Sequence, residues 1–255
     1  MKVLAVIPAR YASTRFPGKP LALLGGHSII ERVWHRVNRA DGIDNAVVAT
    51  DDERICDHME RMAGEGSVMM TSDQHRSGTD RCGEVLDRME KQGDIYDIVI
   101  NVQGDEPFVE PSQLEALTAC FDDPSVQIAT LATPIASTEE LLSPNNVKVV
   151  CSDNGKALYF SRQPIPYRRG VEPERWLNEG QYLKHVGIYA FRSKALHEVC
   201  RLEAGVLEEA EKLEQLRWLA AGYTIHVALT DHANIGIDTP GDLAAAEEYL
   251  KKNNR

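Results

Sequence analysis

The sequence predicts an α/β fold with a mostly parallel, Rossmann-like sheet, helices on both of its faces and a smaller antiparallel insertion. Three observations predict it. Strand and helix signals alternate through about the first 135 residues, the strongest strand is apolar on nearly every position, and hairpin signals begin after about residue 145. Alternating strands and helices are typical of parallel sheets that are covered on both faces. A chain of 255 residues fits one such domain, 1–255, with an inserted segment at about 150–192.

Apolar runs and helix caps in the first half of the chain predict the parallel sheet. Strands are predicted at residues 3–7, 45–50, 68–70, 95–102 and 128–133. Helices are predicted between them at 28–40, 51–64, 79–91 and 111–121. Ser28 and Glu31 form a capping box at the start of the first helix, Asp51 and Asp52 can cap the second, and Gly64 closes it. Because ligands bind beyond the carboxyl ends of such strands, the loops after residues 7, 50, 70 and 102 should share one rim.

The second half of the chain has a different pattern. Segments 147–150 and 157–160 flank Asp153-Asn154-Gly155 and predict a hairpin. A strand at 183–191, one helix over 207–221 and a strand at 224–229 follow. Thr239 is the expected N-cap of a last helix that runs to about Lys251, because Pro240 and Asp242 suit its first turn. We interpret the hairpin region as an antiparallel insertion over the main sheet.

Charge and composition exclude several classes of protein. The formal net charge of −11 argues against a nucleic-acid partner, because duplex phosphates would be repelled. No apolar stretch approaches the roughly 18 residues needed for a membrane span, so no membrane insertion is expected. Arg10 interrupts the first apolar run before a secretory signal forms. Five scattered cysteines without C-x-x-C spacing are expected to be reduced, which predicts a cytoplasmic protein.

A basic loop at the amino terminus is a local exception to the acidic composition. The first acidic residue is Glu31, and four cations precede it: Lys2, Arg10, Arg15 and Lys19. An apolar run stops at Pro8 and opens into the segment ARYASTRFPGKPL, which matches neither G-x-x-x-x-G-K-[ST] nor G-x-G-x-x-G. A buried strand that delivers a cationic loop suits an anion such as a polyphosphate. The alternative is a flexible, solvated loop.

Two aspartates are candidate metal ligands. Asp105 lies in NVQGDEP, directly after the strongest strand, where Gly104 permits an unusual backbone angle. Near a bound polyphosphate a carboxylate there is a good Mg²⁺ ligand; the alternative is an aspartate that only stabilises the turn. Asp238 precedes the predicted N-cap Thr239, so its carboxylate can face the rim or merely support the cap. The separation of about 133 residues leaves open whether the two acids meet.

Other segments carry weaker signals. Ser77, Gly78 and Thr79 can offer hydroxyls and amides to a base or ribose, with Thr79 a candidate N-cap, although such clusters also mark ordinary loops. Arg162, His185, Tyr189, Glu214 and Gln215 lie in the second half; a core histidine and a solvated helix face are the alternatives there. No Ser-His-Asp, Cys-His or zinc motif occurs. Cations and carboxylates remain, which are typical of sites that position phosphoryl groups.

Eight segments together resemble one enzyme family. They are IPARYASTRFPGKPL, VATDDERI, SGTDR, NVQGDEP, ALYFSR, KHVGIYAFR, EKLEQLR and GIDTP. In order and spacing, from Val3 to Leu250, the chain resembles the 3-deoxy-manno-octulosonate (Kdo) cytidylyltransferases. The resemblance implies a fold of the nucleotide-diphospho-sugar transferase type and the reaction CTP + Kdo → CMP-Kdo + diphosphate in lipopolysaccharide biosynthesis. It also implies Mg²⁺ and a homodimer joined through the inserted segment. The anomeric hydroxyl of Kdo would attack the α-phosphate in line.

The resemblance also implies roles for individual residues. The CTP site would consist of Arg10, Arg15, Lys19, Ser77, Gly78, Thr79 and Gln103. Asp105 and Asp238 would share the metal, and with Lys19 they would be the catalytic residues. The sugar site would consist of Arg76, Gln103, Arg162, His185, Tyr189, Glu214 and Gln215. Two positions depart from the family pattern: Gly26-His27-Ser28 after the basic loop, and Arg76. Another acidic sugar, 8-amino-Kdo or sialic acid, therefore stays an alternative substrate, and a non-catalytic nucleotide-binding module is the other alternative.

Overall fold

The chain divides into two compact units, Met1–Thr118 with Asn234–Arg255, and Ala119–Ala233. The computed structural model describes residues 1–232 and 235–253. We describe each unit separately. The predicted α/β class is confirmed, while the predicted single domain with its insertion at 150–192 stays a prediction.

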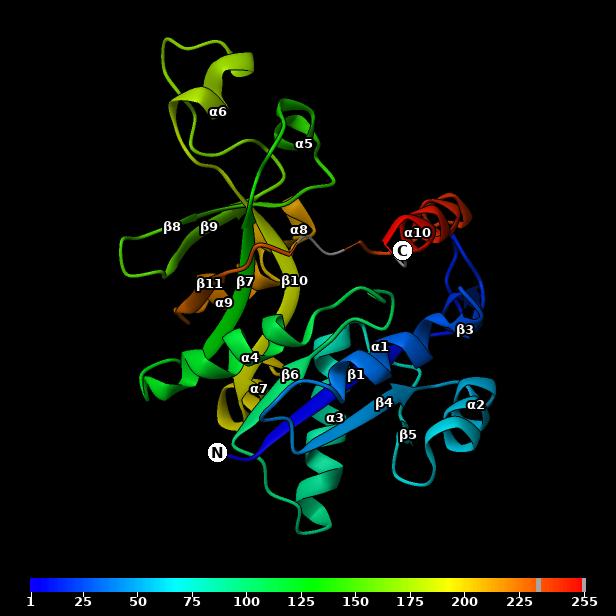
Figure 1. The fold of residues 1–255 in the computed structure, drawn as a ribbon. Helices are drawn as coiled ribbons and strands as arrows, with labels where there is room; N and C mark the ends of the chain where they lie inside the picture. Colours follow the sequence, from blue (N-terminus) through cyan, green and yellow to red (C-terminus); the bar gives the residue numbers. More distant parts are fainter. Residues whose placement is uncertain (233–234, 254–255) are drawn as a thin grey trace. The chain divides into compact units, whose positions relative to one another are not determined.

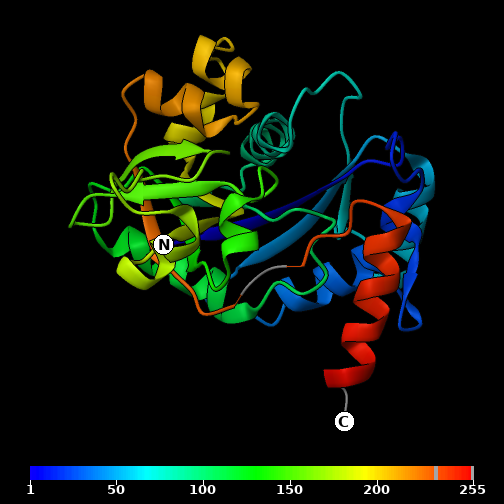
Figure 2. The same ribbon diagram turned by 90° about the horizontal axis from the view of Figure 1, so that it is seen from above.

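The first unit contains a four-stranded parallel sheet in the order β6-β1-β4-β5. Its strands are β1 (Val3–Ala9), β4 (Asn45–Thr50), β5 (Val68–Met70) and β6 (Ile98–Asn101). Residues 3–7 are buried, as expected when both faces of a strand are covered. Helices α1 (Ile29–Val37) and α3 (Gly78–Lys91) pack on opposite faces of these strands (Figures 1 and 2). The carboxyl ends of the strands therefore form one rim, as predicted.

The remaining elements of the first unit are helical or short. They are the 3-10 helix η1 (Lys19–Leu21), strands β2 (Leu23–Leu24) and β3 (His27–Ser28), and helices α2 (Glu53–Ala63), α4 (Pro111–Ala119) and α10 (Pro240–Asn253). The small antiparallel β2-β3 pair was not predicted. Helix α10 packs beside it, as Figures 1 and 2 show. Leu24, Ile29, Phe108, Ile237 and Ala246 form the apolar cluster that fixes the last helix there.

The second unit is built around an antiparallel sheet. Its strands are β7 (Ile128–Pro134), β8 (Lys148–Cys151), β9 (Ala157–Ser161), β10 (Leu183–Arg192) and β11 (Ile225–Leu229). β10 pairs antiparallel with β7 and β8, β8 and β9 form the predicted hairpin, and β11 pairs parallel with β7. The pairing of β10 with β7 shifts register between Val186 and Tyr189. Gly155, at φ 77°, supplies the left-handed turn residue of the hairpin.

Helices of the second unit are short and were mostly missed. They are η2 (Cys120–Asp122), α5 (Thr138–Leu142), η3 (Pro173–Arg175), α6 (Trp176–Glu179), α7 (Ser193–Val199), α8 (Val206–Glu211) and α9 (Gln215–Ala220). The single helix predicted over 207–221 is wrong, because Lys212 adopts a left-handed conformation at φ 53° and separates α8 from α9. No residue of α8 is buried, whereas Leu216 and Trp218 of α9 are fully buried. The left-handed residue Lys212 thus separates an exposed helix from a buried one.

Local helix signals in the first unit were accurate, with two exceptions. The capping box of Ser28 and Glu31 forms, and Asp52 caps α2. The predicted N-cap Thr79 is wrong: Ser77 caps α3, and its hydroxyl accepts a hydrogen bond from the amide of Asp80. The strand predicted over 95–102 is shorter: β6 begins at Ile98 and ends at Asn101, and Ile95 is exposed before it. Among the described residues, no helix has the length and apolar character needed to cross a membrane.

Candidate functional site

A cavity of about 290 Å³ lies on the rim of the first unit. Three segments line it: the basic loop after β1 within residues 8–20, the start of α3 with the preceding residues, 76–81, and the turn after β6, residues 103–105. These are the loops that the sequence placed together after residues 7, 70 and 102. The cavity contains cations from the first two segments and a carboxylate from the third, so it can receive an anion together with a metal ion.

Lys19 joins the two predicted metal ligands. Its Nζ lies 2.6 Å from Oδ2 of Asp105 and 3.1 Å from Oδ1 of Asp238. Arg15 adds a second cation, with one guanidinium nitrogen 2.9 Å from Oδ2 of Asp238. The side chain of Lys19 is only 11% exposed, whereas those of Asp105 and Asp238 are 32% and 47% exposed. The structure therefore brings together two acids that are far apart in the sequence.

The turn that carries Asp105 is held against the end of β1. The amide of Gly104 donates to the carbonyl oxygen of Pro8 at 3.3 Å. A Cβ atom on Gly104 would lie 2.6 Å from that same oxygen, so the turn can approach this closely only with glycine. On the other side, the amide of Ile237 donates to the carbonyl oxygen of Asp105 at 2.9 Å. This last bond brings the segment of Asp238 to the same place.

Asp242, and not Asp238, completes the start of α10. Its Oδ2 accepts hydrogen bonds from the amides of Asp238 and Thr239, at 3.0 and 2.8 Å. In return, the hydroxyl of Thr239 accepts from the amide of Asp242 at 3.2 Å. Burial raises the pKa of Asp242, but these hydrogen bonds outweigh it and lower the pKa below its ordinary value. The carboxylate of Asp238 is thus left to face Lys19 and Arg15.

The other predicted CTP-site residues border the cavity or support it. Arg10 is exposed, and its guanidinium donates to the carbonyl oxygen of His75. Ser77, Gly78 and Gln103 line the cavity. Thr79 does not line it but is buried behind it, where its hydroxyl lies 3.5 Å from the side-chain nitrogen of Asn101. The side-chain amide of Gln103 donates to Asn101 at 3.1 Å, so one asparagine braces both segments.

Glu84 fixes the loop before α3. Its carboxylate accepts from the amide of Ser72 at 2.9 Å and also contacts His75 and Arg88. Burial raises the pKa of Glu84, but these hydrogen bonds outweigh it and hold the pKa below its ordinary value of 4.5. Arg76 lies between His75, which contacts Glu84, and the N-cap Ser77, and its side chain is exposed at the cavity.

The sequence argument missed Arg81, which also lines the cavity. Its side chain is fully buried and binds Oγ1 of Thr71 at 2.5 Å and Oδ2 of Asp51 at 2.8 Å. Arg81 thereby connects α3 to the residues that follow β4 and β5. Its position within SGTDR was the only available signal.

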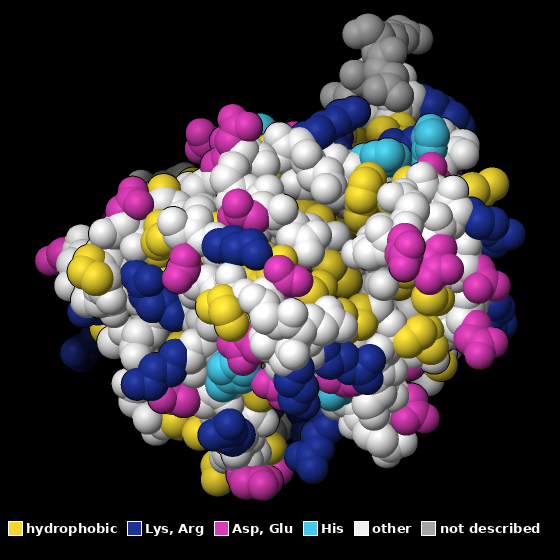
Figure 3. Space-filling view, turned by 90° about the horizontal axis from the view of Figure 1, so that it is seen from below, with side chains coloured by type: hydrophobic (Ala, Val, Ile, Leu, Met, Phe, Trp, Pro, Cys, Tyr) yellow, Lys and Arg dark blue, Asp and Glu magenta, His cyan; other side chains and the backbone are white. Residues whose placement is uncertain are grey.

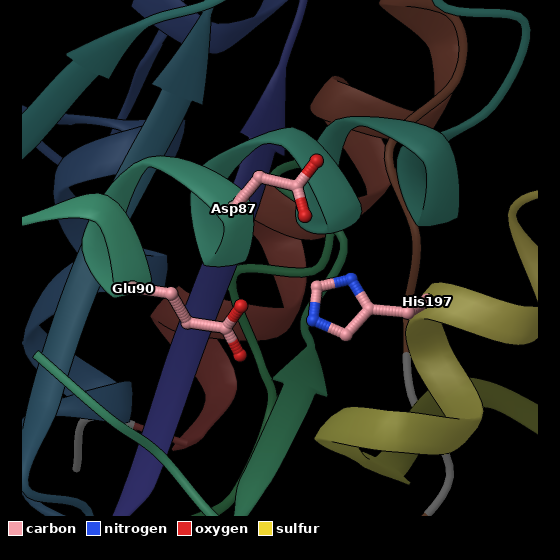
Figure 4. Close-up of side chains that lie close together, drawn as sticks. All are labelled: Asp87, Glu90 and His197. Carbon is pink, nitrogen blue, oxygen red and sulfur yellow. The ribbon is translucent and has the colours of Figure 1, made fainter.

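Further along α3, Asp87 and Glu90 are three residues apart and project to the same side of the helix (Figure 4).

His185 and Tyr189, both predicted for the sugar site, lie in the second unit on β10. His185 is half-buried, contacts the rings of Phe160 and Tyr189, and its Nε2 lies 2.9 Å from Oγ1 of Thr130. Burial lowers the pKa of His185 to about 3, so the imidazole is neutral at ordinary pH. Burial also raises the pKa of the Tyr189 phenol well above its ordinary value. Both groups are therefore uncharged hydrogen-bonding side chains.

The remaining predicted sugar-site residues have internal partners. The guanidinium of Arg162 donates to three carbonyl oxygens, those of Pro144, Glu211 and Lys212. Glu214 accepts from Arg217 at 2.7 Å, and Gln215 is buried at the start of α9. These three bonds use three of the five N–H donors of the guanidinium, so Arg162 is held in place by the surrounding backbone. These roles, like the others implied for the site, stay predictions.

The donor set on the rim fits a hard divalent cation. Mg²⁺ typically takes one or two protein carboxylates, and phosphate oxygens and water complete its shell. Asp105 and Asp238 supply two carboxylates that already converge on one positive charge. Elsewhere the charges are mixed: on the face shown in Figure 3, basic and acidic side chains of the described residues are interspersed.

Along most of its length the chain is similar to known cytidylyltransferases. A family model described as cytidylyltransferase matches residues 4–225. A 3-deoxy-manno-octulosonate cytidylyltransferase of Bacteroides thetaiotaomicron is 52% identical over 254 residues, which cover 98% of this chain and 99% of that protein. Another, from Syntrophotalea carbinolica, is 45% identical over 98% of this chain and 99% of its own length.

Solved structures give the same result. The structure of CMP:2-keto-3-deoxy-manno-octonic acid synthetase complexed with CTP matches with a TM-score of 0.90 and 40% identity over 99% of both chains. A 4-diphosphocytidyl-2C-methyl-D-erythritol synthase from Anaerococcus prevotii, at 18% identity and a TM-score of 0.65, covers 98% of this chain and 96% of its own and shares the fold. From the identity over nearly the whole chain, the protein belongs to the 3-deoxy-manno-octulosonate cytidylyltransferase family.

Proposed function

We propose that the protein activates Kdo by the reaction CTP + Kdo → CMP-Kdo + diphosphate. The observation that carries the proposal is the cavity of the first unit, where Lys19 lies between Asp105 and Asp238 beside the basic loop. Identity to Kdo cytidylyltransferases along almost the full chain supports the choice of substrates. We further propose that the enzyme is a cytoplasmic homodimer and that its product serves lipopolysaccharide biosynthesis.

The basic loop would bind the triphosphate. Arg10 and Arg15 are exposed, and Lys19 is the buried member of the set. Each can donate charge-assisted hydrogen bonds to phosphate oxygens. As the bond to the α-phosphorus breaks, negative charge develops on the departing diphosphate, and fixed cations stabilise it without reorganisation. The same residues therefore serve binding and the chemical step.

Asp105 and Asp238 would hold Mg²⁺ during the reaction. The bound ion would neutralise phosphate charge and lower the pKa of the sugar hydroxyl. The protein's own part is to fix two carboxylates on one rim, through the close approach of Gly104 to β1 and the hydrogen bond between Ile237 and Asp105. No strong side-chain base is required.

The resemblance implies which residues would bind the acidic sugar. Gln103 and Arg76 line the cavity of the first unit. In the second unit, neutral His185 and Tyr189 can hydrogen-bond sugar hydroxyls, and Arg162 has the planar fork that suits a carboxylate. These assignments follow the resemblance.

Release of pyrophosphate from CTP and Mg²⁺ tests the proposal. The full chain is assayed with Kdo, 8-amino-Kdo and sialic acid in parallel, and we expect turnover with Kdo. Turnover only with 8-amino-Kdo or only with sialic acid would overturn the substrate, and no turnover with any of them would favour a nucleotide-binding module. Asp105→Asn and Asp238→Asn should each remove turnover while the chain stays folded. Asp41→Asn, on an exposed acid outside the cavity, is the matched control.

A further inference from the structure

Cations of the chain already occupy three carboxylate oxygens of the proposed metal ligands. Lys19 contacts Oδ2 of Asp105 and Oδ1 of Asp238, at 2.6 and 3.1 Å. Arg15 contacts Oδ2 of Asp238 at 2.9 Å. The side chain of Lys19 is 11% exposed, so the carboxylates replace much of the water that its ammonium would otherwise bind. Two acids are thus balanced by two bases within the protein.

A divalent ion bound by both acids must use an oxygen of Asp238 that Lys19 or Arg15 already contacts. Mg²⁺ binds carboxylate oxygens at about 2.0–2.1 Å and requires near-octahedral geometry. An ammonium 2.6 Å from the shared Oδ2 of Asp105 would then lie within about 5 Å of the ion. Like charges at that separation repel strongly in a partly buried site. The ammonium of Lys19 in this position therefore weakens the binding of a divalent ion by the two aspartates.

We infer that Lys19 is a built-in competitor of the metal, and that nucleotide relieves this competition. The inference rests on the function proposed above and adds a coupling between its metal and its nucleotide. Phosphate oxygens of a nucleoside triphosphate in the cavity accept hydrogen bonds from the same ammonium, which has three donors on a flexible stem. Arg15 is 64% exposed and can turn to the phosphates as well. Both carboxylates are then free for the ion.

The consequence is a thermodynamic coupling between nucleotide and metal. The protein without nucleotide binds divalent ions weakly, and the triphosphate raises that affinity. Because linkage is reciprocal, the metal raises the affinity for the triphosphate by the same factor. Metal affinity therefore depends on the position of the Lys19 ammonium as well as on the two aspartates.

Titration of the full chain with Mn²⁺ in the absence of nucleotide tests the inference. Electron paramagnetic resonance of the free ion gives the bound fraction without any turnover. Lys19→Gln should bind Mn²⁺ at least about tenfold more tightly than the wild type, because one repelling charge is removed. Arg15→Gln should shift affinity in the same direction by a smaller factor. Since Arg15 is exposed, this second variant decides the matter if Lys19→Gln does not fold.

Arg76→Gln is the matched control. Arg76 lines the same cavity and, within residues 1–232 and 235–253, forms no ion pair with either aspartate. Its loss should raise Mn²⁺ affinity much less than the loss of Lys19, because Arg76 does not contact the carboxylate oxygens. An unchanged or weaker affinity in Lys19→Gln, or an equal gain in Arg76→Gln, would overturn the inference.

A further variant separates this inference from the proposed function. Adding Asp105→Asn to Lys19→Gln should abolish the gain in Mn²⁺ affinity. If Mn²⁺ binding to the wild type does not depend on Asp105, the proposed metal site itself is wrong. If Asp105 is required but Lys19→Gln gains nothing, competition by Lys19 is refuted and the proposed metal site stands.

Discussion

Gly104→Ala is the sharpest test of how the acidic turn is positioned. A Cβ atom at residue 104 would lie 2.6 Å from the carbonyl oxygen of Pro8, 3.3 Å from Cδ1 of Ile30 and 3.4 Å from Cβ of Ala9. The first contact is about 0.8 Å shorter than an ordinary one of 3.4 Å. The oxygen belongs to the backbone of β1 and cannot rotate away. The substitution must therefore push the turn, and Asp105 with it, away from β1.

The size of the effect follows from this displacement. Forcing an extra methyl group into a packed site costs about 1–3 kcal/mol of unfolding free energy. For a chain of this size, each kcal/mol lowers the Tm by about 2–4 °C. A misplacement of about 1 Å at reacting groups costs on the order of 100-fold in rate. We therefore expect kcat/KM to fall by at least about tenfold, measured by pyrophosphate release, in a protein that still unfolds cooperatively.

Gly236→Ala provides the control for this experiment. Gly236 is exposed, lies two residues before Asp238, and a Cβ atom there would have no neighbour within 4 Å. Its substitution should change the unfolding free energy by no more than about 0.5 kcal/mol and leave turnover intact. If Gly104→Ala matches the wild type in both Tm and kcat/KM, or if Gly236→Ala loses as much activity, the steric argument is refuted.

Three further predictions concern the supporting residues. Arg81→Met leaves Asp51 without its buried partner and should lower the free energy of unfolding in urea by about 3–5 kcal/mol; an unchanged midpoint would contradict this. Glu84 has a lowered pKa, so its contribution to stability is full above pH 4.5 and is lost as the pH falls through the folded pKa. In Glu84→Gln the free energy of unfolding in urea should therefore depend less on pH over that acid range than in the wild type. Equal pH dependence in the two proteins would count against this. His185 has a pKa of about 3, so His185→Gln should remove no ionisation from the kcat profile between about pH 5 and 8; loss of one would disprove the assignment.

Local chemistry made much of the first unit predictable. The strand Asn45–Thr50 has its predicted bounds, and the capping box of Ser28 and Glu31 forms. These features depend on residues within one turn or one apolar run, so the sequence alone determines them. The common rim also followed, because parallel strands place their carboxyl ends together. The cationic loop and the turn of Asp105 were therefore expected as neighbours.

Features that depend on distant parts of the chain were not predictable in this way. Nothing in the residues around Asp238 signals that Ile237 hydrogen-bonds to Asp105. The role of Arg81 depends on partners 10 and 30 residues away. The prediction of one helix over 207–221 failed for another reason. The apolar spacing continues through Lys212, although the chain breaks there and α8 and α9 differ in burial. Tertiary packing overrides the helical pattern there.

The first unit is assembled from two segments that are far apart in the sequence, which has a consequence for biosynthesis. A ribosome makes residues 1–118 first, and it makes Asp238 and the helix that packs on Leu24 only after the whole second unit. A nascent or prematurely terminated chain thus carries the amino-terminal cations without their second acidic partner. Catalytic competence should therefore require synthesis past residue 238, and fragments that end before residue 238 should be inert however well their sheet has formed.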